Sequence, residues 1–253
     1  LGSGDIGMIM ARRLTLEGAH VQAVFEIQPY PSGLPRNIEQ CLNDYDIPLY
    51  LSHTVTEIHG NSRLTGVTVS AVDEHFKPIP GTEREYRCDT LILSVGLIPE
   101  NELSIDAGVD LDSRTRGAVV DEYFQTGVDG IFAAGNVLHV HDLVDFVSME
   151  AEELAESAAE YVRRGRLPEC PLAVRTDGNI NHTVPQRVSG IRAFKLSMRV
   201  NRPMKDCRVV VRQNGVELAS KKMKKAIPAE MIQLAVKADR IAQNGDLEVS
   251  VEC

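Results

Sequence analysis

The sequence predicts an α/β fold over its first two thirds, followed by a small all-β domain. Three observations support this prediction. Strand and helix signals alternate over residues 1–95. Strand signals and the longest helix signal follow in residues 96–165. After the linker-like stretch "RLPECP", short strand signals without intervening helices fill residues 171–253. Alternating strands and helices are typical of a parallel sheet covered by helices, whereas a series of short strands is typical of a sandwich or barrel.

The chain begins with a glycine-rich turn, "LGSGDIG", which fits the pattern G-x-G-x-x-G with Gly2, Gly4 and Gly7. In a dinucleotide-binding unit the first glycine makes the tight turn after a strand. The second lets the backbone approach the pyrophosphate, and the third lets the helix pack closely on the sheet. Helical apolar spacing in "MIMARRLTLEGAH" supports this interpretation. A glycine turn that binds no ligand is the alternative.

Glu26 ends the next strand signal, "VQAVFE", roughly 20 positions after the glycines. A carboxylate at this place binds the ribose hydroxyls of NAD and repels the additional phosphate of NADP. Neither Ile27 nor Gln28 offers a cation that would reverse this preference. Residues 1–95 are therefore predicted to be a Rossmann-like nicotinamide domain that prefers NAD(H). The alternative for Glu26 is an acidic residue on the surface.

The rest of residues 1–95 should complete this domain. "GLPRNIEQCLNDYD" predicts a second helix, and "IPLYLSHTVTEIHG" predicts extended chain. The alternation in "LTGVTVSAVD" indicates a half-exposed antiparallel strand. The run Leu91-Ile92-Leu93 in "YRCDTLILSVG" predicts a strand buried on both faces.

Residues 96–165 have a different pattern. A short strand and a turn are expected in "GAVVDEYFQT", and an apolar strand in "VDGIFAAGNV" runs into Gly135 and Asn136. The longest helix pattern follows, in "DLVDFVSMEAEELAESAAEYVRRG". We expect Asp142 to be its N-cap, and Gly165 follows two arginines at its end.

Residues 171–253 carry the signals of a small antiparallel β domain. Asn214-Gly215 lies between two apolar stretches, which is a strong hairpin signal. A basic run follows, and we expect it to be a solvated strand edge that blocks pairing with other chains. It comprises Lys221, Lys222, Lys224 and Lys225.

Composition narrows the classes of function. A net charge of −9 argues against nucleic acid and anionic membranes as partners. No apolar run predicts a membrane span, and five cysteines without a C-x-x-C pattern suit a reducing cytoplasm. His139 and His141 lie two positions apart, but the sequence shows no third ligand, so no metal is expected.

The order of these motifs carries a family resemblance. "GSGDIG" with Glu26, then "TLILSVGLIPENEL", then "GIFAAGNV" and a long helix resemble the pyridine nucleotide–disulfide oxidoreductase-like superfamily of flavoproteins. The resemblance implies that residues 1–95 are an NAD(H)-binding domain without its first strand. It also implies that residues 96–165 are the C-terminal part of an FAD-binding domain.

The resemblance implies roles for five residues. Gly96 matches the glycine that ends the last strand of the family's nicotinamide domain, with a plain turn glycine as the alternative. Gly135 and Asn136 match the second FAD motif, although Asn136 stands where an acid usually binds a ribityl hydroxyl, and a simple Asn turn is the alternative. The backbone of Leu143 and Val144 would face the flavin's pyrimidine edge, with contacts to the core as the alternative.

The resemblance implies an FAD-dependent oxidoreductase that accepts hydride from NADH and passes electrons to an unknown acceptor. Its catalytic side chains are not assigned. "ENEL" and "GNVLHVHDLVD" are similar to flavin oxidoreductases that accompany glycerol-3-phosphate-dehydrogenase-like subunits, which implies such a partner. The family's FAD glycine motif precedes the nicotinamide domain, so we expect a fragment that lacks this motif and is inactive alone. The alternative function is a non-catalytic scaffold subunit of a dehydrogenase complex.

Overall fold

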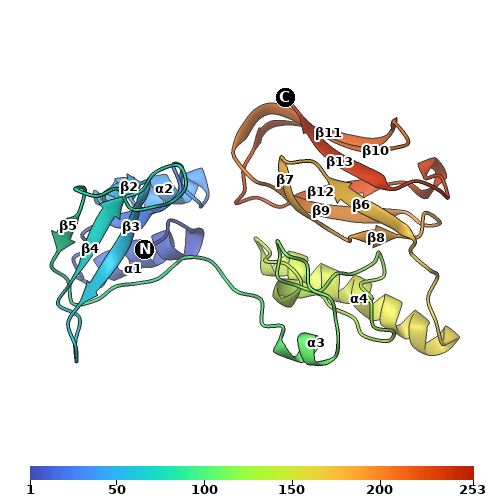
Figure 1. Cartoon of the computed structure of the whole chain (residues 1–253), viewed down its shortest axis with the longest axis horizontal. Coiled ribbons are helices and arrows are strands. Elements are labelled where there is room, and N and C mark those ends of the chain that lie inside the picture. Colours follow the sequence, from blue (N-terminus) through green and yellow to red (C-terminus); the bar gives the residue numbers. More distant parts are fainter. The chain divides into compact units, whose positions relative to one another are not determined.

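The computed structural model describes all 253 residues and has two compact units, Leu1–Gly96 and Leu97–Cys253 (Figure 1). The predicted α/β fold with a β region at its C-terminal end is confirmed. The domain boundaries at residues 95, 165 and 171 stay predictions. None of the chain's helices combines the length and the apolar character that crossing a membrane requires.

The first unit begins with a helix packed on a short parallel sheet. Helix α1 (Asp5–Leu16) buries Met8 and Ala11 in a core that includes Val24 of strand β1. Pro35 opens α2 at a position where its missing N–H costs nothing. The remaining elements of this layer are β1 (Val24–Glu26), α2 (Pro35–Cys41), the 3₁₀ turn η1 (Asn43–Tyr45) and β2 (Leu49–Leu51), and β1 pairs with β2 in parallel.

A three-stranded antiparallel sheet completes the first unit. It comprises β3 (His53–His59), β4 (Gly66–Ala71) and β5 (Arg84–Tyr86), with β4 in the centre. The prediction that β4 is half-exposed is wrong, because its first five residues are all buried. Its polar side chains are covered by polar partners on β3. His59 Nε2 lies 2.7 Å from the Thr68 hydroxyl, and Thr56 Oγ1 lies 3.3 Å from Ser70 Oγ.

The predicted buried strand at Leu91-Ile92-Leu93 does not form, so this prediction is wrong. The side chain of Leu93 is 63% exposed, and no strand is present there. Leu1 makes two hydrogen bonds to this segment, as a neighbouring parallel strand would. Its amino group donates to Ile92 O, and its carbonyl oxygen accepts the Ser94 N–H, each at 2.7 Å. A ladder needs a neighbour over several residues. The segment instead borders a groove of about 810 Å³ beside α1 and β1.

The second unit begins with irregular chain and two helices. Its elements are α3 (Glu102–Asp106), the 3₁₀ turn η2 (Gly135–Val137) and α4 (Val144–Arg164). The strands expected in "GAVVDEYFQT" and "VDGIFAAGNV" are present only as isolated bridges, such as Val120 with Thr126 and Gln125 with Phe132. A tight turn prevents longer pairing, because the Asp121 carboxylate accepts the N–H groups of both Tyr123 and Gln125.

Helix α4 ends as predicted but begins differently. Gly165 closes it in the left-handed region at φ +76°, where glycine is favoured. The prediction that Asp142 is the N-cap is wrong, since Leu143 holds that position. The Asp142 carboxylate instead accepts hydrogen bonds from the Arg199 guanidinium and from the Met231 N–H.

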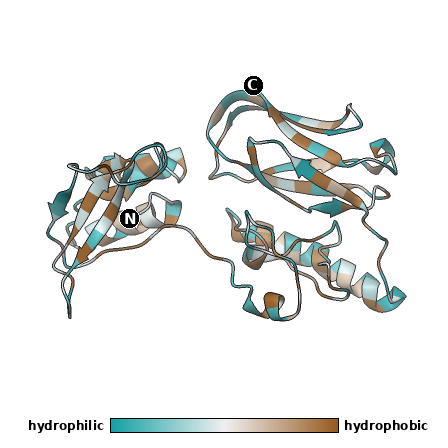
Figure 2. Cartoon of the chain, in the orientation of Figure 1, coloured by the Kyte–Doolittle hydropathy of each residue, from teal (hydrophilic) through white to brown (hydrophobic).

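The C-terminal part of the second unit consists of two packed sheets. One has the order β11-β10-β13-β6-β8 and the other β12-β9-β7. Figure 2 shows hydrophobic and hydrophilic residues alternating along these strands, and in β13 every second residue is buried. The strands are β6 (Leu172–Thr176), β7 (Ile180–Val184), β8 (Arg187–Val188), β9 (Phe194–Val200), β10 (Met204–Gln213), β11 (Val216–Ala226), β12 (Ile232–Val236) and β13 (Leu247–Glu252), with the 3₁₀ turn η3 (Ala238–Arg240) before β13.

The hairpin between β10 and β11 forms as predicted. Asn214 (φ +51°) and Gly215 (φ +79°) both lie in the left-handed region that such tight turns require. The expectation of a purely antiparallel domain is wrong at one pairing, because β13 runs parallel to β6 from Leu247 to Val249. β13 enters the sheet between β10 and β6, so a long connection rather than a hairpin sets its direction.

Candidate functional site

Two of the three motif glycines are required by close packing within the chain. Gly2 has φ +95°, and a side chain there would collide with the carbonyl oxygen of Ser94. A Cβ on Gly7 would lie 2.6 Å from Ser94 Cβ. Both positions therefore exclude larger residues, whether or not a ligand is bound.

Gly4 is different, because nothing in the chain excludes a side chain there. Its φ of −63° is ordinary, and a Cβ would lie 3.7 Å from Ser94 Oγ, which is a normal contact. Gly4 is also the N-cap of α1, and no side chain caps this helix. The nearby Asp5 carboxylate is directed away, to Leu34 N–H and Asn37 Nδ2. The N-terminus of α1 thus offers its free N–H groups and positive dipole end to an anion.

Glu26 lies at the end of β1 beside this turn. Its side chain is 3% exposed, which contradicts the alternative of an acidic residue on the surface. Oε2 accepts hydrogen bonds from Ser3 N–H (3.0 Å), Ser3 Oγ (2.5 Å) and Ser32 Oγ (2.6 Å), and Oε1 accepts one from Gln28 N–H (2.9 Å). Burial alone would raise the pKa of Glu26, but these hydrogen bonds outweigh it and lower the pKa. The group is therefore a carboxylate at neutral pH.

Ser3 and Ser32 were missed as site residues by sequence reasoning. Ser3 is the variable residue between two motif glycines, and Ser32 belongs to the loop after β1. Gly33 fixes this loop against the glycine turn, because a Cβ there would lie 2.9 Å from Ser3 O. The signal available in the sequence was the Ser-Gly pair 32–33, which allows such a close approach.

The second predicted motif lies in the second unit, at η2 and the start of α4. Gly135 has φ +75° and donates its N–H to Glu150 Oε1 at 2.7 Å. Asn136 is exposed, and its side-chain oxygen accepts the His141 N–H at 3.1 Å. The Leu143 and Val144 side chains are 53% and 75% exposed, so the alternative of contacts to the core is wrong. The N-terminus of α4 has no side-chain cap and is open to a ligand.

Gly96 is the last residue of the first unit. It is exposed, has φ +107°, and no atom would contact a Cβ there. Its backbone conformation favours glycine, which suits a turn whether or not a cofactor lies nearby. Its assignment to the cofactor site stays a prediction.

A buried cluster of two histidines and one glutamate lies beside Gly135, and we name it the His–Glu cluster. It comprises His139, His141 and Glu150, whose side chains are 1%, 3% and 10% exposed. Glu150 Oε2 lies 2.7 Å from His139 Nε2 and 3.1 Å from His141 Nε2. Burial would raise the pKa of Glu150, but the hydrogen bonds from both histidines and from Gly135 N–H lower it to about 2. Glu150 was missed from the sequence, because only the fold brings it to the histidines.

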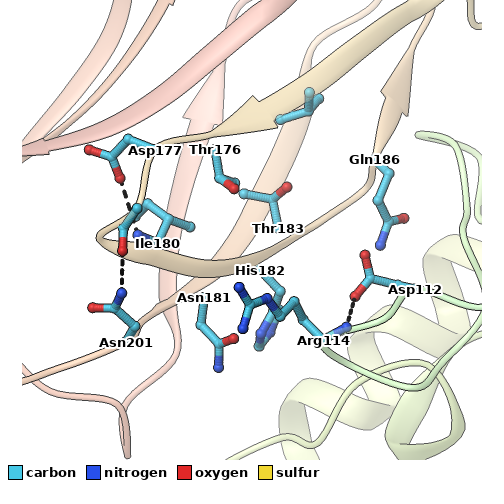
Figure 3. A pocket seen from close by; sticks show the side chains of 12 residues that line it. Asp112, Arg114, Thr176, Asp177, Ile180, Asn181, His182, Thr183, Gln186 and Asn201 are labelled. Atoms are coloured by element: carbon cyan, nitrogen blue, oxygen red, sulfur yellow. Dashed lines mark hydrogen bonds between the residues drawn. The ribbon is translucent and has the colours of Figure 1, made fainter.

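A polar pocket of about 360 Å³ lies in the second unit, where β6 and β7 meet the segment that includes Asp112 and Arg114 (Figure 3). His182 on β7 lines it and is 9% exposed, and its Nε2 has no hydrogen-bond partner. Burial, together with His139 and Arg199, lowers the pKa of His182 to about 4. The Gln186 side chain accepts the Val120 N–H, which leaves its Nε2 buried without a partner.

None of the five cysteines forms a disulfide. The pKa of four of the thiols is raised, chiefly by burial, at Cys41, Cys88, Cys170 and Cys207. A thiol with a raised pKa is a poor nucleophile at neutral pH. These four thiols are therefore not activated for nucleophilic chemistry.

Comparison with known proteins gives a consistent result. The model of the pyridine nucleotide-disulphide oxidoreductase family matches residues 1–161. A mitochondrial dihydrolipoyl dehydrogenase of Caenorhabditis elegans is 32% identical over 145 residues, covering 54% of this chain and 28% of the relative. A dihydrolipoyl dehydrogenase of Pseudomonas aeruginosa is 27% identical over 184 residues, covering 71% of this chain and 37% of the relative. The chain thus spans about a third of the length of these relatives.

Among solved structures, the thioredoxin reductase of T. acidophilum is similar with a TM-score of 0.53 and 27% sequence identity. The similarity covers 64% of this chain and 51% of that one.

Proposed function

The chain belongs to the pyridine nucleotide-disulphide oxidoreductase family, and from this membership we propose that it is part of an FAD-dependent oxidoreductase that accepts hydride from NADH. Residues 1–95 would bind NAD(H), and residues 96–165 would contribute the C-terminal part of the FAD site. The electron acceptor stays unassigned. None of the cysteines forms a disulfide, and the pKa of four of the five thiols is raised.

The residues at the N-terminus of α1 fit a dinucleotide. Gly4 carries this proposal, since the packing of the chain does not require glycine there, whereas a pyrophosphate approaching the helix does. Glu26 lies next to this position as a carboxylate that can accept ribose hydroxyls. It also holds Ser3 and Ser32, which fixes the turn before the ligand arrives.

The residues at the start of α4 fit the family's second FAD motif. Gly135 provides the turn, and the exposed Asn136 can donate a hydrogen bond through its amide nitrogen. The open first turn of α4, at Leu143 and Val144, offers positive dipole to the negative charge of a reduced flavin. Bound FAD would supply the electron-accepting ring, while these residues position it and stabilise its charge.

The partner subunit resembling glycerol-3-phosphate dehydrogenase remains a proposal that rests on "ENEL" and "GNVLHVHDLVD". In that arrangement the flavoprotein that contains this chain would take up electrons from NADH, and the partner subunit would determine the second substrate.

Binding of NADH to the Gly4→Ala variant tests the nucleotide site. We expect the variant to bind NADH at least about tenfold more weakly in calorimetry, because the methyl group would occupy the path of the pyrophosphate. The melting temperature should be unchanged, because the methyl group contacts the chain at an ordinary distance. Gly127→Ala is a matched control, since a Cβ there contacts nothing. Unchanged NADH affinity in Gly4→Ala would contradict the proposal.

A further inference from the structure

The His–Glu cluster has no role in the proposed binding of NADH. Two hydrogen bonds connect it to the proposed FAD site, from Gly135 N–H to Glu150 and from His141 N–H to Asn136. One suitable ligand atom from each of its three residues lies within 4.8 Å of the other two. No other group of three histidine, cysteine or acidic residues in the chain converges in this way.

The distances within the cluster are close to those of a metal site. In a tetrahedral zinc site with bonds of roughly 2.1 Å, neighbouring ligand atoms lie about 3.4 Å apart. The Glu150 Oε2 atom lies 2.7 Å from His139 Nε2 and 3.1 Å from His141 Nε2. The three ligand atoms all lie within 4.8 Å of one another, so the side chains would need to adjust around an ion without any change of the backbone path.

Both histidines can change tautomer to bind an ion. A histidine binds a metal through a nitrogen without a proton, so coordination through Nε2 places the proton on Nδ1. The Nδ1 atoms of His139 and His141 are buried without a hydrogen-bond partner. No donor to Nδ1 therefore fixes either ring as the Nε2–H tautomer. Only the Glu150 carboxylate favours that tautomer, and this carboxylate would bind the ion instead.

The carboxylate is oriented by the backbone. Gly135 donates its N–H to Glu150 Oε1 at 2.7 Å, which leaves Oε2 directed at the two imidazoles. In metal sites, the carboxylate oxygen that does not bind the metal typically accepts a hydrogen bond of this kind, which fixes the orientation of the side chain.

We propose that His139, His141 and Glu150 bind one divalent transition-metal ion, for which Zn²⁺ is the best fit. Two imidazole nitrogens and one carboxylate oxygen form a donor set that zinc proteins use, with a fourth position left for water or another small ligand. The site links the loop after η2 to the second turn of α4. This goes beyond the proposed function, because it requires neither NADH nor FAD.

The expectation that the chain holds no metal rested on the lack of a third ligand in the sequence. Glu150 follows His141 by nine residues, and it reaches the histidines because the loop before α4 lies against the second turn of this helix. The alternative is a cluster held by hydrogen bonds alone, in which both Nε2–H groups donate to the carboxylate. The two arrangements differ in whether the chain retains an ion.

The test is equilibrium dialysis of the full chain, first freed of metal with a chelator and then exposed to Zn²⁺. We expect one zinc per chain by elemental analysis, and visible absorption of a low-symmetry site when Co²⁺ replaces Zn²⁺. Glu150→Gln and His139→Gln should each weaken Zn²⁺ binding by at least about tenfold. His75→Gln changes an exposed histidine outside the cluster and should bind as the unmodified chain does.

A variant that fails to fold would also fail to bind zinc, so the circular dichroism of each variant is measured together with its zinc binding. The unmodified chain decides the question independently of the variants. If it retains no stoichiometric zinc after dialysis, or if a folded Glu150→Gln variant binds zinc as tightly as the unmodified chain, the proposal is overturned.

Discussion

The Glu26 carboxylate accepts two hydrogen bonds from Ser3, one from its N–H at 3.0 Å and one from its hydroxyl at 2.5 Å. One buried acid at the end of β1 therefore fixes the variable residue inside the glycine turn. The same oxygen holds Ser32, so Glu26 connects the turn to the loop after β1. A residue assigned to ligand recognition thus also stabilises the fold of its own site.

This double role predicts a stability effect. Glu26→Ala should lower the free energy of unfolding by roughly 1–3 kcal/mol, because the buried donors of Ser3 and the half-buried hydroxyl of Ser32 lose their acceptor. Glu26→Gln should lose less, because the amide oxygen can still accept. Urea denaturation followed by circular dichroism measures both. Equal stability of the Ala variant and the unmodified chain would show that the observed hydrogen bonds contribute nothing net.

The same residue predicts cofactor preference. The unmodified protein should bind NADH more tightly than NADPH, because the Glu26 carboxylate repels the additional phosphate. Glu26→Gln should narrow the difference, since it removes the charge and keeps the shape. Calorimetric titration with both nucleotides measures the ratio of dissociation constants. Equal affinities in the unmodified protein would refute the assignment of Glu26.

A third prediction concerns pH and His182. Burial is the main cause that lowers its pKa from 6.5 to about 4, and His139 and Arg199 lower it further while Asp112 raises it. Between these two values the unfolded chain binds more protons than the folded chain, so stability falls as the pH decreases from 6.5 to 4. Protonation of this residue alone should lower the free energy of unfolding by up to about 2 kcal/mol between pH 7 and pH 5.

His182→Gln should remove this part of the pH dependence, whereas His75→Gln, at an exposed position, should leave it unchanged. Denaturant unfolding at pH 7 and pH 5 compares the three proteins. If the His182→Gln variant loses as much stability on acidification as the unmodified chain, then His182 is not the residue responsible.

The elements that sequence reasoning predicted correctly depend on local signals. Helix α1 follows from apolar spacing after the glycine turn, and Gly165 ends α4 because its own backbone adopts the left-handed conformation. The Asn214-Gly215 turn likewise needs only its two residues. Such features are encoded within a few neighbouring positions.

The elements that were predicted wrongly depend on distant residues. Leu91-Ile92-Leu93 has the composition of a buried strand, but Leu1 alone hydrogen-bonds beside it in that register. Asp142 has the chemistry of an N-cap, but Arg199 and Met231 engage its carboxylate. These partners lie too far away along the chain to be recognised from the neighbouring sequence.

The candidate site divides in the same way. The glycine motif and Glu26 were visible as a pattern, and the structure brings Gly4 and Glu26 to one turn. The partners that define the chemistry were not visible, since Ser32 reaches Glu26 and Glu150 reaches His139 only through folding. The roles of Ser32 and Glu150 depend on contacts that only the folded chain makes.

The position of β13 between β10 and β6 affects how a nascent chain matures. Ala173 on β6 is hydrogen-bonded to Asp246 just before β13, across 73 residues of sequence. While the ribosome is still translating the intervening segment, β6 and β10 each present an open edge that β13 will later close. Such edges can pair with other chains, and long-range closure of this kind is slow. Until β13 has been synthesised, the second unit should therefore be prone to pair with other chains through these edges.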